Sequence, residues 1–319
     1  MRRDGSPWTG LGAVFLKEFA DHLSSTRMRV LEWLVLLVGV GAVYASLGDI
    51  RAVLTSDPFL LLRVFTVARD PKPSFLVLMT FLIPLISIAL TFDAVNSEFN
   101  HRTMSRVLSQ PVYRDAVLLG KFLAALATLA VSLTVLWLLV FGLTLIMLGV
   151  PPSTEEVARA FTFLLVTLGY AGVWLAIAML FSVVFRSAAT SALCAYGLWF
   201  VVSVLWSFVV SFIVDALAPN EVARLLGVQS VEQLQWQLGL SRLSPNVLYT
   251  EAVLPLLDPA TRTLGLVFPA DLVGAVRGSP LPFDQSVLVA WPQITALFAA
   301  VIALFAVTYV LFQRQEIRA

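Results

Sequence analysis

Few residues of this sequence could carry out chemistry. The candidates are two histidines, His22 and His101, one cysteine, Cys194, and the acid Asp93. An enzyme within a membrane would need a nucleophile with a base, or a set of metal ligands. The sequence holds no His-Glu-x-x-His or Gly-x-Ser-x-Gly pattern that would supply them. We therefore predict a non-catalytic chain with no catalytic residue, no metal site and no cofactor of its own.

Asp93 and Cys194 each admit two interpretations. Asp93 ends a long apolar stretch, where an acid could bind a proton or an ion. We favour a carboxylate at the membrane surface that is paired with a neighbouring basic group, because the centres of the apolar stretches hold no second charge. Cys194 lies in the apolar run 192–195, which favours a small buried hydrophobic residue over a reactive thiol, and a single cysteine allows no intrachain disulfide.

The composition places these residues in a membrane protein. Of 319 residues, 59% are hydrophobic and only 13% are charged, and the mean hydropathy is +0.89. Soluble domains average about 45–50% apolar and about 25% charged residues. A net charge of +1 also lacks the clustered Lys and Arg that neutralise phosphates, so we expect a lipid bilayer as the surroundings and no nucleic-acid partner.

Six stretches are apolar and long enough to cross a hydrocarbon core of about 30 Å, which takes about 20 residues of helix. They predict an all-α, polytopic membrane protein with six transmembrane helices. The third and fourth exceed the minimum length, so they should tilt or protrude. Scattered hydroxyls such as Ser87 and Thr91 are interpreted as packing groups rather than ligands. The predicted spans are 30–50, 75–95, 116–148, 158–185, 190–214 and 287–312.

The distribution of Lys and Arg predicts the orientation, because positively charged short loops stay on the cytoplasmic side. With the N-terminus inside, the cytoplasmic segments carry twelve basic and eight acidic residues, among which Glu32 and Asp93 are counted. The outer segments carry nine basic and twelve acidic residues. The even number of spans then returns the C-terminus to the same side, so both termini are predicted to be cytoplasmic.

Four segments follow from this layout. Residues 1–29 predict a cytoplasmic amphipathic helix that lies in the membrane interface. Residues 30–214 hold spans one to five, with a polar elbow at 96–115 between the second and the third. Residues 215–286 predict a small helical cap outside the membrane, and 287–319 the sixth span with a cytoplasmic tail. The apolar stripe of the first helix comprises Leu11, Val14, Phe15, Phe19 and Leu23, while Lys17, Glu18, Asp21 and Ser25 occupy the remaining face.

Local signals predict short helices in the two outer segments. Residues 51–74 predict a short helix followed by a rigid turn at prolines 71 and 73. In 215–286 we expect three helix starts and two glycine ends. The starts are Asn220, Ser230 in a capping-box pattern with Gln233, and Ser244 followed by Pro245; the ends are Gly227 and Gly239.

The elbow is the most distinctive polar segment. Its pattern predicts a short polar helix, a stop at Ser109-Gln110, and a new helix with Pro111 in its first turn. Glu98 and Arg102 stand four residues apart and are expected to pair on the polar helix. The alternative is an ordinary positively charged loop, and physical reasoning alone leaves both interpretations open.

The chain also lacks the Gly-x-x-x-x-Gly-Lys-Ser/Thr loop that binds nucleotide phosphates. Gly120-Lys121 is present, but Asp115 occupies the position of the first glycine. No cytoplasmic segment is long enough to fold an ATPase domain. If ATP drives this protein, a separate chain must bind it.

The elbow resembles the ABC-2-type permease family, the membrane subunits of ABC exporters, and in particular the six-span bacterial branch that includes the permease serving nitrous oxide reductase maturation. The likeness extends loosely through the first helix, the six-span layout and residues 243–249. Arg102 departs from the family, which has glycine before the threonine, and this puts the geometry of that turn in question. The family pattern is met by Asp93, Glu98, Thr103, Leu108, Ser109, Pro111, Val112, Arg114, Gly120 and Lys121.

The resemblance implies a permease subunit in a bacterial inner membrane. It would pair with a second permease, either another copy or a related chain, and bind an ABC ATPase dimer whose subunits hold ATP and Mg. The first helix would lie beside the coupling element. The residues implied to contact the ATPase are Glu98, Phe99, Arg102, Thr103, Arg106, Leu108, Ser109, Pro111 and Arg114.

Two other functions compete with transport. One is a mechanical subunit that passes ATP-driven motion to an extracytoplasmic partner through residues 215–286, without a transported substrate. The other is a passive membrane scaffold. A transport path for a large or apolar substrate needs no charges, so the uncharged spans fit several substrate classes and identify none.

Overall fold

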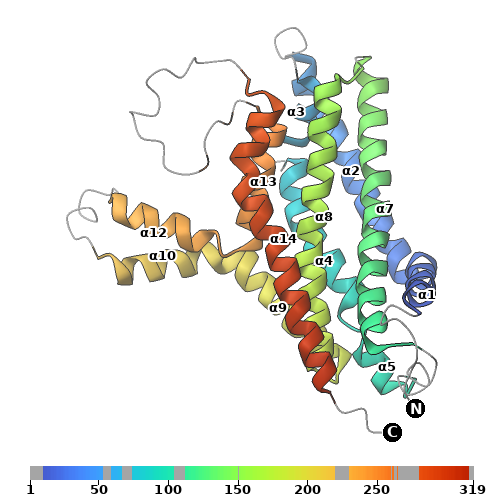
Figure 1. Cartoon of the computed structure of the whole chain (residues 1–319). Helices are drawn as coiled ribbons and strands as arrows, with labels where there is room; N and C mark the ends of the chain where they lie inside the picture. The colour runs from blue at the N-terminus through green and yellow to red at the C-terminus, as the bar shows by residue number, and fades with distance from the viewer. Residues whose placement is uncertain are drawn as a thin grey trace.

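Every element in the described part of the computed structural model is a helix (Figure 1). The structure describes residues 10–52, 59–66, 74–103, 112–149, 151–219, 230–259, 261, 264 and 280–315, and for this part the all-α prediction is confirmed. In chain order the elements are α1 (Leu11–Ser24), α2 (Thr26–Ala52), α3 (Leu60–Thr66), α4 (Phe75–Thr91), α5 (Asn96–Asn100), α7 (Arg114–Leu148), α8 (Thr154–Val184), α9 (Ala188–Phe200), the π-helix η1 (Val201–Leu205), α10 (Trp206–Leu217), α12 (Val231–Ser241), α13 (Pro245–Leu257) and α14 (Phe283–Arg314).

Five helical stretches of the described part are long and apolar enough to cross a membrane. Each overlaps one of the predicted spans two to six, so these five stretches form helices of the expected length and apolar character; that they cross the membrane as part of a six-span layout stays a prediction. The first predicted span lies inside α2, a continuous helix of 27 residues; that α2 crosses the membrane stays a prediction. The five stretches are Phe75–Asn100, Arg114–Met147, Thr154–Val184, Ala188–Leu217 and Phe283–Arg314.

Helix α8 is the centre of the bundle, since it contacts α4, α7, α9, α13 and α14. Two glycines let α14 approach it closely. An added Cβ would lie 3.1 Å from Phe298 Cζ at Gly169, and 3.1 Å from Val301 Cγ2 at Gly172. Small residues at such a crossing allow the close van der Waals packing that holds helices together in lipid.

Helix α13 packs among the long helices, beside α3, α4, α8 and α14. Tyr249 of α13 is fully buried and stacks on Tyr170 of α8, with ring centroids 4.3 Å apart. The Tyr170 hydroxyl donates to Thr80 O at 2.8 Å and also contacts Asn246 of α13. The structure therefore departs from the predicted cap at 215–286: α13 lies alongside the long helices, because its polar side chains complete a hydrogen-bonded core.

Arg159 joins three helices at the end of the bundle where α8 begins. Its side chain is completely buried, and Nη1 donates to the carbonyls of Pro255 and Leu256 in the last turn of α13 and to Ser286 Oγ of α14 at 3.0 Å. Glu155 lies one turn earlier and pairs with it at 2.8 Å. Carbonyls at the end of a helix lack intrahelical partners and carry partial negative charge, so a cation there is favourable.

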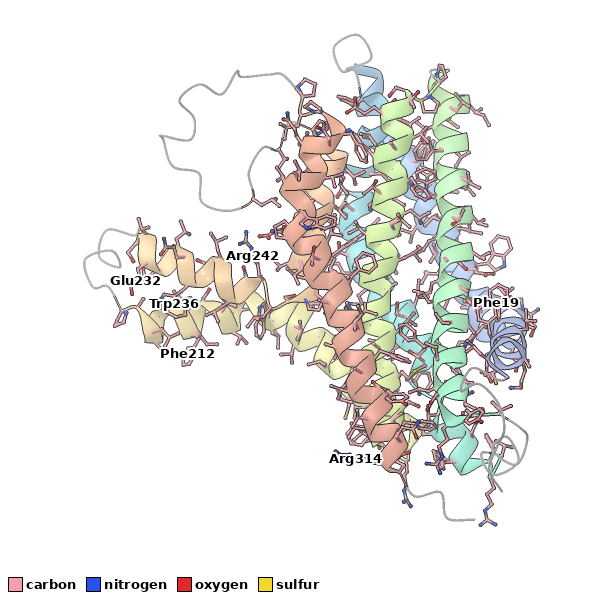
Figure 2. The ribbon with its side chains drawn as sticks, in the orientation of Figure 1. Phe19, Phe212, Glu232, Trp236, Arg242 and Arg314 are labelled. Carbon is pink, nitrogen blue, oxygen red and sulfur yellow. The ribbon has the colours of Figure 1, made fainter. Side chains whose placement is uncertain are left out.

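Helices α10 and α12, which we call the arm, project away from the bundle (Figure 1). The stretch predicted as the fifth span is therefore bent, because α9 continues into η1 and α10 then takes a new direction. Ser244 Oγ donates to Val202 O of η1 at 2.9 Å, and Trp206 Nε1 donates to Leu240 O at 3.1 Å. The first bond ties η1, at the base of the arm, to the residue before α13, and the second joins α10 to α12 within the arm. Phe212 and Trp236 lie on the arm away from the bundle (Figure 2).

Several local predictions can be compared with the helices. The capping box is confirmed, since Ser230 Oγ accepts from Gln233 N at 3.2 Å and Gln233 Oε1 accepts from Ser230 N at 3.0 Å. Helix α12 runs to Ser241 rather than ending at Gly239, and Pro245 is the first residue of α13, as predicted. Helix α3 confirms a short helix within 51–74. The helix predicted for 220–227 and the turn at residues 71 and 73 lie outside the described residues.

The remaining polar groups of the spans serve mainly in packing. Thr91 Oγ1 lies 3.1 Å from Ser87 O on its own helix and 3.2 Å from Leu175 O on α8, which agrees with the predicted packing role. Cys194 is half-buried on α9. The predicted burial of this small residue is met in part, because α9 lies at the edge of the bundle and leaves much of its surface uncovered.

Candidate functional site

The polar elbow begins after α4, at the end of the bundle where α1 also lies (Figure 1). Within it, α5 is held against the end of α8. Ser182 Oγ accepts from the backbone N–H of Asn96 at 3.2 Å, and the Asn96 side chain donates to Phe185 O at 3.3 Å. Asn100 Nδ2 donates to Arg186 O at 2.9 Å. Because α9 starts two residues after Arg186, these bonds connect α5 to the junction between α8 and α9.

Lys121 is the electrostatic centre of the site. Its side chain is only 5% exposed, and its ammonium lies 2.6 Å from Glu98 Oε1 and 3.0 Å from Glu18 Oε1. The three residues come from α7, α5 and α1, so one buried cation joins three separate elements. Lys17 adds a second cation 2.9 Å from Glu18. A buried charge is stable only when it is paired in this way.

Gly120 explains how α1 reaches this cation. Helix α1 is seen end-on beside α7 in Figure 1, so it crosses α7 steeply. An added Cβ at Gly120 would lie 2.8 Å from Val14 Cγ1 and 3.4 Å from Phe15 N. Phe19 also lies on α1 beside α7 (Figure 2). The adjacent Gly120 and Lys121 thus have complementary roles: the glycine leaves room for α1, and the lysine binds its carboxylate.

The apolar stripe predicted for α1 is correct in part. Leu11, Val14, Phe15 and Phe19 are partly buried, whereas Leu23 is 37% exposed. Glu18, which the pattern places on the polar face, is partly buried because Lys121 draws it inward.

Two titratable groups of α1 have shifted pKa values. Burial opposes ionisation of Glu18, but Lys121 and Lys17 outweigh it, so the pKa of Glu18 lies below its ordinary value. Burial lowers the pKa of His22, and Lys121 lowers it further, against the opposing effect of Glu18, Asp93 and Asp21. Both shifts reflect the docking of α1, because an undocked helix would expose the two side chains to water.

Docking of α1 should weaken as the pH falls through about 6.5, the ordinary pKa of histidine. Below that value the undocked helix binds a proton at His22 more readily than the docked one, so protonation favours undocking. The lowered pKa of Glu18 acts only at more acidic pH. Hydrogen exchange of the α1 amides at about pH 7.5 and about pH 5.5, with each rate compared with the intrinsic rate of an unstructured amide at the same pH, should show lower protection factors in acid. A His22→Gln variant should lose this difference, and an equal difference in the variant would contradict the assignment.

Asp93 is ion-paired, as we predicted in preference to an ion-binding acid. Arg27 donates to both carboxylate oxygens, with Nη2 at 2.9 Å and Nη1 at 3.2 Å, and Nη1 also donates to Ala89 O at 3.0 Å. The guanidinium lies 5.0 Å from the centroid of the Phe92 ring. These contacts join the start of α2 to the end of α4.

The predicted pairing of Glu98 with Arg102 is wrong. Helix α5 ends at Asn100, and Arg102 has a φ of 55°, in the left-handed region. The N–H of Arg102 donates to Phe99 O at 3.1 Å, and that of Thr103 donates to Glu98 O at 2.9 Å. This pair of bonds is the Schellman helix end, which favours glycine at the left-handed position. Arg102 therefore occupies a glycine position in geometry as well as in the family pattern, and Glu98 is free to reach Lys121.

A comparison of Arg102→Gly with Arg102→Ala should isolate this backbone strain. Both variants remove the arginine side chain, but only glycine adopts a positive φ without a steric cost of about 1 kcal/mol. We expect the glycine variant to be the more thermostable of the two in detergent. Equal melting temperatures would show that the left-handed turn is not present in solution.

The structure brings some of the predicted site residues together and separates others. Glu98 and Phe99 turn inward, while Asn100, His101 and Arg102 form an exposed tip. Thr103 completes the helix end.

Arg114 lies away from this tip. It is the first residue of α7 and donates to Gln315 O at 3.3 Å. Arg106, Leu108, Ser109 and Pro111, with the predicted stop at Ser109-Gln110, lie outside the described residues.

The predicted set of contact residues omitted Glu18, Lys121 and Asn96. Glu18 carries a recognisable signal, because it stands in register with Leu11, Phe15 and His22 on the inward face of α1, and a charge within such a stripe indicates a buried partner. Lys121 stands in a helix that is otherwise apolar for many residues. Asn96 gives no signal in a single sequence, since its partners are backbone carbonyls.

Among the described residues no group of three His, Cys, Asp or Glu side chains could hold a metal ion. The site consists of an exposed tip that asparagines bond to the residues between α8 and α9 and that one lysine joins to α1 and α7.

Comparisons with known proteins agree with the sequence pattern. Residues 12–317 match the family model described as ABC-2 family transporter protein. The chain is similar to the probable ABC transporter permease protein NosY of Pseudomonas aeruginosa, with 32% identity over 308 residues that cover 94% of this chain and 97% of that protein. It is also similar to the protein of the same name from Stutzerimonas stutzeri, with 26% identity over 260 residues that cover 75% of this chain and 88% of the relative.

Proposed function

This chain belongs to the ABC-2 family of transporter proteins, and from that premise we propose that it is the permease subunit of an exporter whose separate ATPase dimer binds the elbow. A second permease, either another copy of this chain or a related one, completes the membrane part. The arrangement lies in a bacterial inner membrane with α1 and the end of α14 on the cytoplasmic side. The common position of these two elements at one end of the bundle supports that orientation.

The proposal depends on one observation: some residues of the elbow are exposed, and others anchor it to the bundle. The tip at residues 100–102 is exposed, whereas Glu98 and Asn96 fix the same short helix to the bundle. A segment that only linked two spans would not need a buried lysine and two asparagines to hold it. A segment that is displaced by a bound ATPase does need these anchoring residues, because packed and hydrogen-bonded elements move together.

The displacement of the elbow would be transmitted to the long helices through specific contacts. Closure of the ATPase dimer displaces α5, and the bonds of Asn96 and Asn100 pass the displacement to the residues between α8 and α9. Lys121 passes it at the same time to α7 and α1. Tilting of α8, the central helix, then changes the packing of every helix it contacts.

Retention of the ATPase by the permease tests the proposal. The two proteins are co-expressed and purified through a tag on the permease. A double variant, His101→Glu with Arg102→Glu, reverses the charge of the exposed tip and should strongly reduce the co-purifying ATPase. The control is Glu232→Lys, which changes charge on the exposed arm. Full retention by the tip variant, or a permease that never retains an ATPase, would refute the assignment.

A mechanical role without a transported substrate is the second candidate, and the arm favours it. The elbow contacts the residues that precede α9, and α9 continues through η1 into α10 of the arm. Motion received at the tip would thus reach a projection that an extracytoplasmic partner can contact. A permease that retains ATPase coupling after removal of its transport path would favour this role over export.

A further inference from the structure

The three residues that connect α8 to α9 lie beside the exposed tip of the elbow. We call these residues, 185–187, the junction. Asn100 of the tip donates to Arg186 O at 2.9 Å, and Asn96 donates to Phe185 O at 3.3 Å. Gln315, which follows α14, donates to Val183 O in the last turn of α8. The junction and the tip are therefore adjacent at one end of the bundle.

The backbone of this region is anchored, while its side chains are exposed. The carbonyls of Val183, Phe185 and Arg186 each accept a hydrogen bond from another segment. In contrast, the side chains of Arg186 and Ser187 are exposed, and that of Val184 is 49% exposed. A segment with a fixed backbone presents its side chains in a defined position, which reduces the entropy that is lost when a partner binds.

Arg186 carries a positive charge that the described part of the chain does not neutralise. Within this part its guanidinium has neither an ion-pair partner nor a hydrogen-bond partner. The first turn of α9, which follows it, holds no acid. Exposed arginines also stand on the tip, at Arg102, and at the end of α14, at Arg314 (Figure 2). This end of the bundle therefore presents a positively charged surface.

Two acids near this surface are already engaged. Glu98 binds the buried Lys121, and Asp115 of α7 accepts a hydrogen bond from Gln313. Neither carboxylate is left to neutralise Arg186. A guanidinium binds a carboxylate through two parallel hydrogen bonds, so an acidic group of a partner protein fits this position.

The depth of the junction favours a protein partner over a phospholipid. Gln315 bonds to Val183 O and accepts from Arg114, so the junction is level with the start of α7. Lys121, which binds α1, stands seven residues further along α7, about 10 Å away. If α1 lies in the membrane interface, as predicted, the junction is farther from it than the about 5–7 Å that the headgroups occupy on each side.

We infer that the junction is a second docking surface for the ATPase, on which Arg186 pairs with a carboxylate of that protein. The inference rests on the proposed function and extends the interface from the elbow to the loop between α8 and α9. It adds a residue that the sequence pattern did not include among the contacts. The ATPase would then bind two segments that flank the end of the central helix, and one of them leads directly into α9.

Photo-crosslinking tests the inference on the full-length permease co-expressed with the ATPase in membranes. A photoreactive amino acid replaces Arg186, and in matched variants it replaces His101 of the tip or Glu232 of the arm. Irradiation should join positions 186 and 101 to the ATPase and leave position 232 free of it. A phospholipid adduct alone at position 186 would overturn the inference. So would an ATPase adduct from position 101 but not from position 186.

Charge reversal gives an independent measurement. Arg186→Glu should weaken binding of the ATPase to the permease in nanodiscs about tenfold, because it places like charges in contact. Arg186→Lys keeps the charge and should bind more tightly than Arg186→Glu. Arg29→Glu makes the same charge change on an exposed residue of α2, and it should leave binding unchanged. Equal losses from Arg186→Glu and Arg29→Glu would reveal a general effect of charge and overturn the inference.

The outcomes also separate this inference from the proposed function. If the double variant of His101 and Arg102 releases the ATPase but Arg186→Glu does not, the junction is not a docking surface, and the elbow keeps its proposed role. A permease that never binds an ATPase contradicts both.

Discussion

The Lys121→Met variant should lose both stability and coupling to the ATPase. Methionine preserves most of the side-chain volume but leaves Glu18 and Glu98 buried without their shared cation. Removal of one partner from a buried ion pair typically costs about 3–5 kcal/mol. We expect a lower melting temperature in detergent and, under the proposed function, a loss of coupling to the ATPase, because α1 and the elbow are no longer fixed to α7.

Two controls distinguish the ionic role of Lys121 from loss of packing. Adding Glu18→Gln and Glu98→Gln to Lys121→Met removes the uncompensated charges and should restore much of the stability. Lys17→Met removes a lysine whose side chain is 64% exposed, and such surface pairs contribute at most about 1 kcal/mol. If the triple variant were as unstable as Lys121→Met alone, the defect would lie in packing.

Arg159→Met should destabilise the opposite end of the bundle by about 3–5 kcal/mol. The substitution leaves the carbonyls of Pro255 and Leu256 without their donor and separates α13 from α8 and α14. Unlike Lys121→Met, it should lower the melting temperature while leaving ATPase binding at the elbow intact in the molecules that remain folded. Thermal unfolding followed by tryptophan fluorescence measures the first effect, and co-purification measures the second.

Arg159→Lys and Glu155→Gln are the matched variants. Lysine keeps the charge but lacks the planar group that reaches several carbonyls at once, so its stability should be intermediate. Glu155 is 39% exposed, and its neutralisation should cost far less than loss of the arginine. Equal losses for all three variants would show that the ion pair, rather than the bonds to α13, holds this end.

Hydrophobic length alone was sufficient to predict the five helical stretches that are long and apolar enough to cross a membrane, because each appears in the sequence as a long apolar run. The same argument could not foresee the bend at η1 or the position of α13. Both depend on single bonds between distant residues, such as Ser244 with Val202 and Asn246 with Tyr170, and local periodicity carries no information about such partners.

The structure of the elbow could also be predicted from the sequence only in part. Its place in the chain and its polar character are evident from the sequence, and the family pattern points to its role. The pairing of Glu98 was mispredicted because helical spacing assumes a helix long enough to include Arg102, whereas α5 has five residues. The missing glycine was the better signal, since a helix end with a left-handed residue explains why the family prefers glycine there.

The interior position of α13 determines how hybrid permeases should be built. An exchange of residues 215–286 between two relatives would also replace Asn246 and Tyr249, whose partners on α8 remain those of the recipient. A graft of residues 206–243, which stops before Ser244, transfers the whole arm and keeps the recipient's polar interior intact. Domain-swap experiments that map specificity to this region should therefore place their junction at that serine.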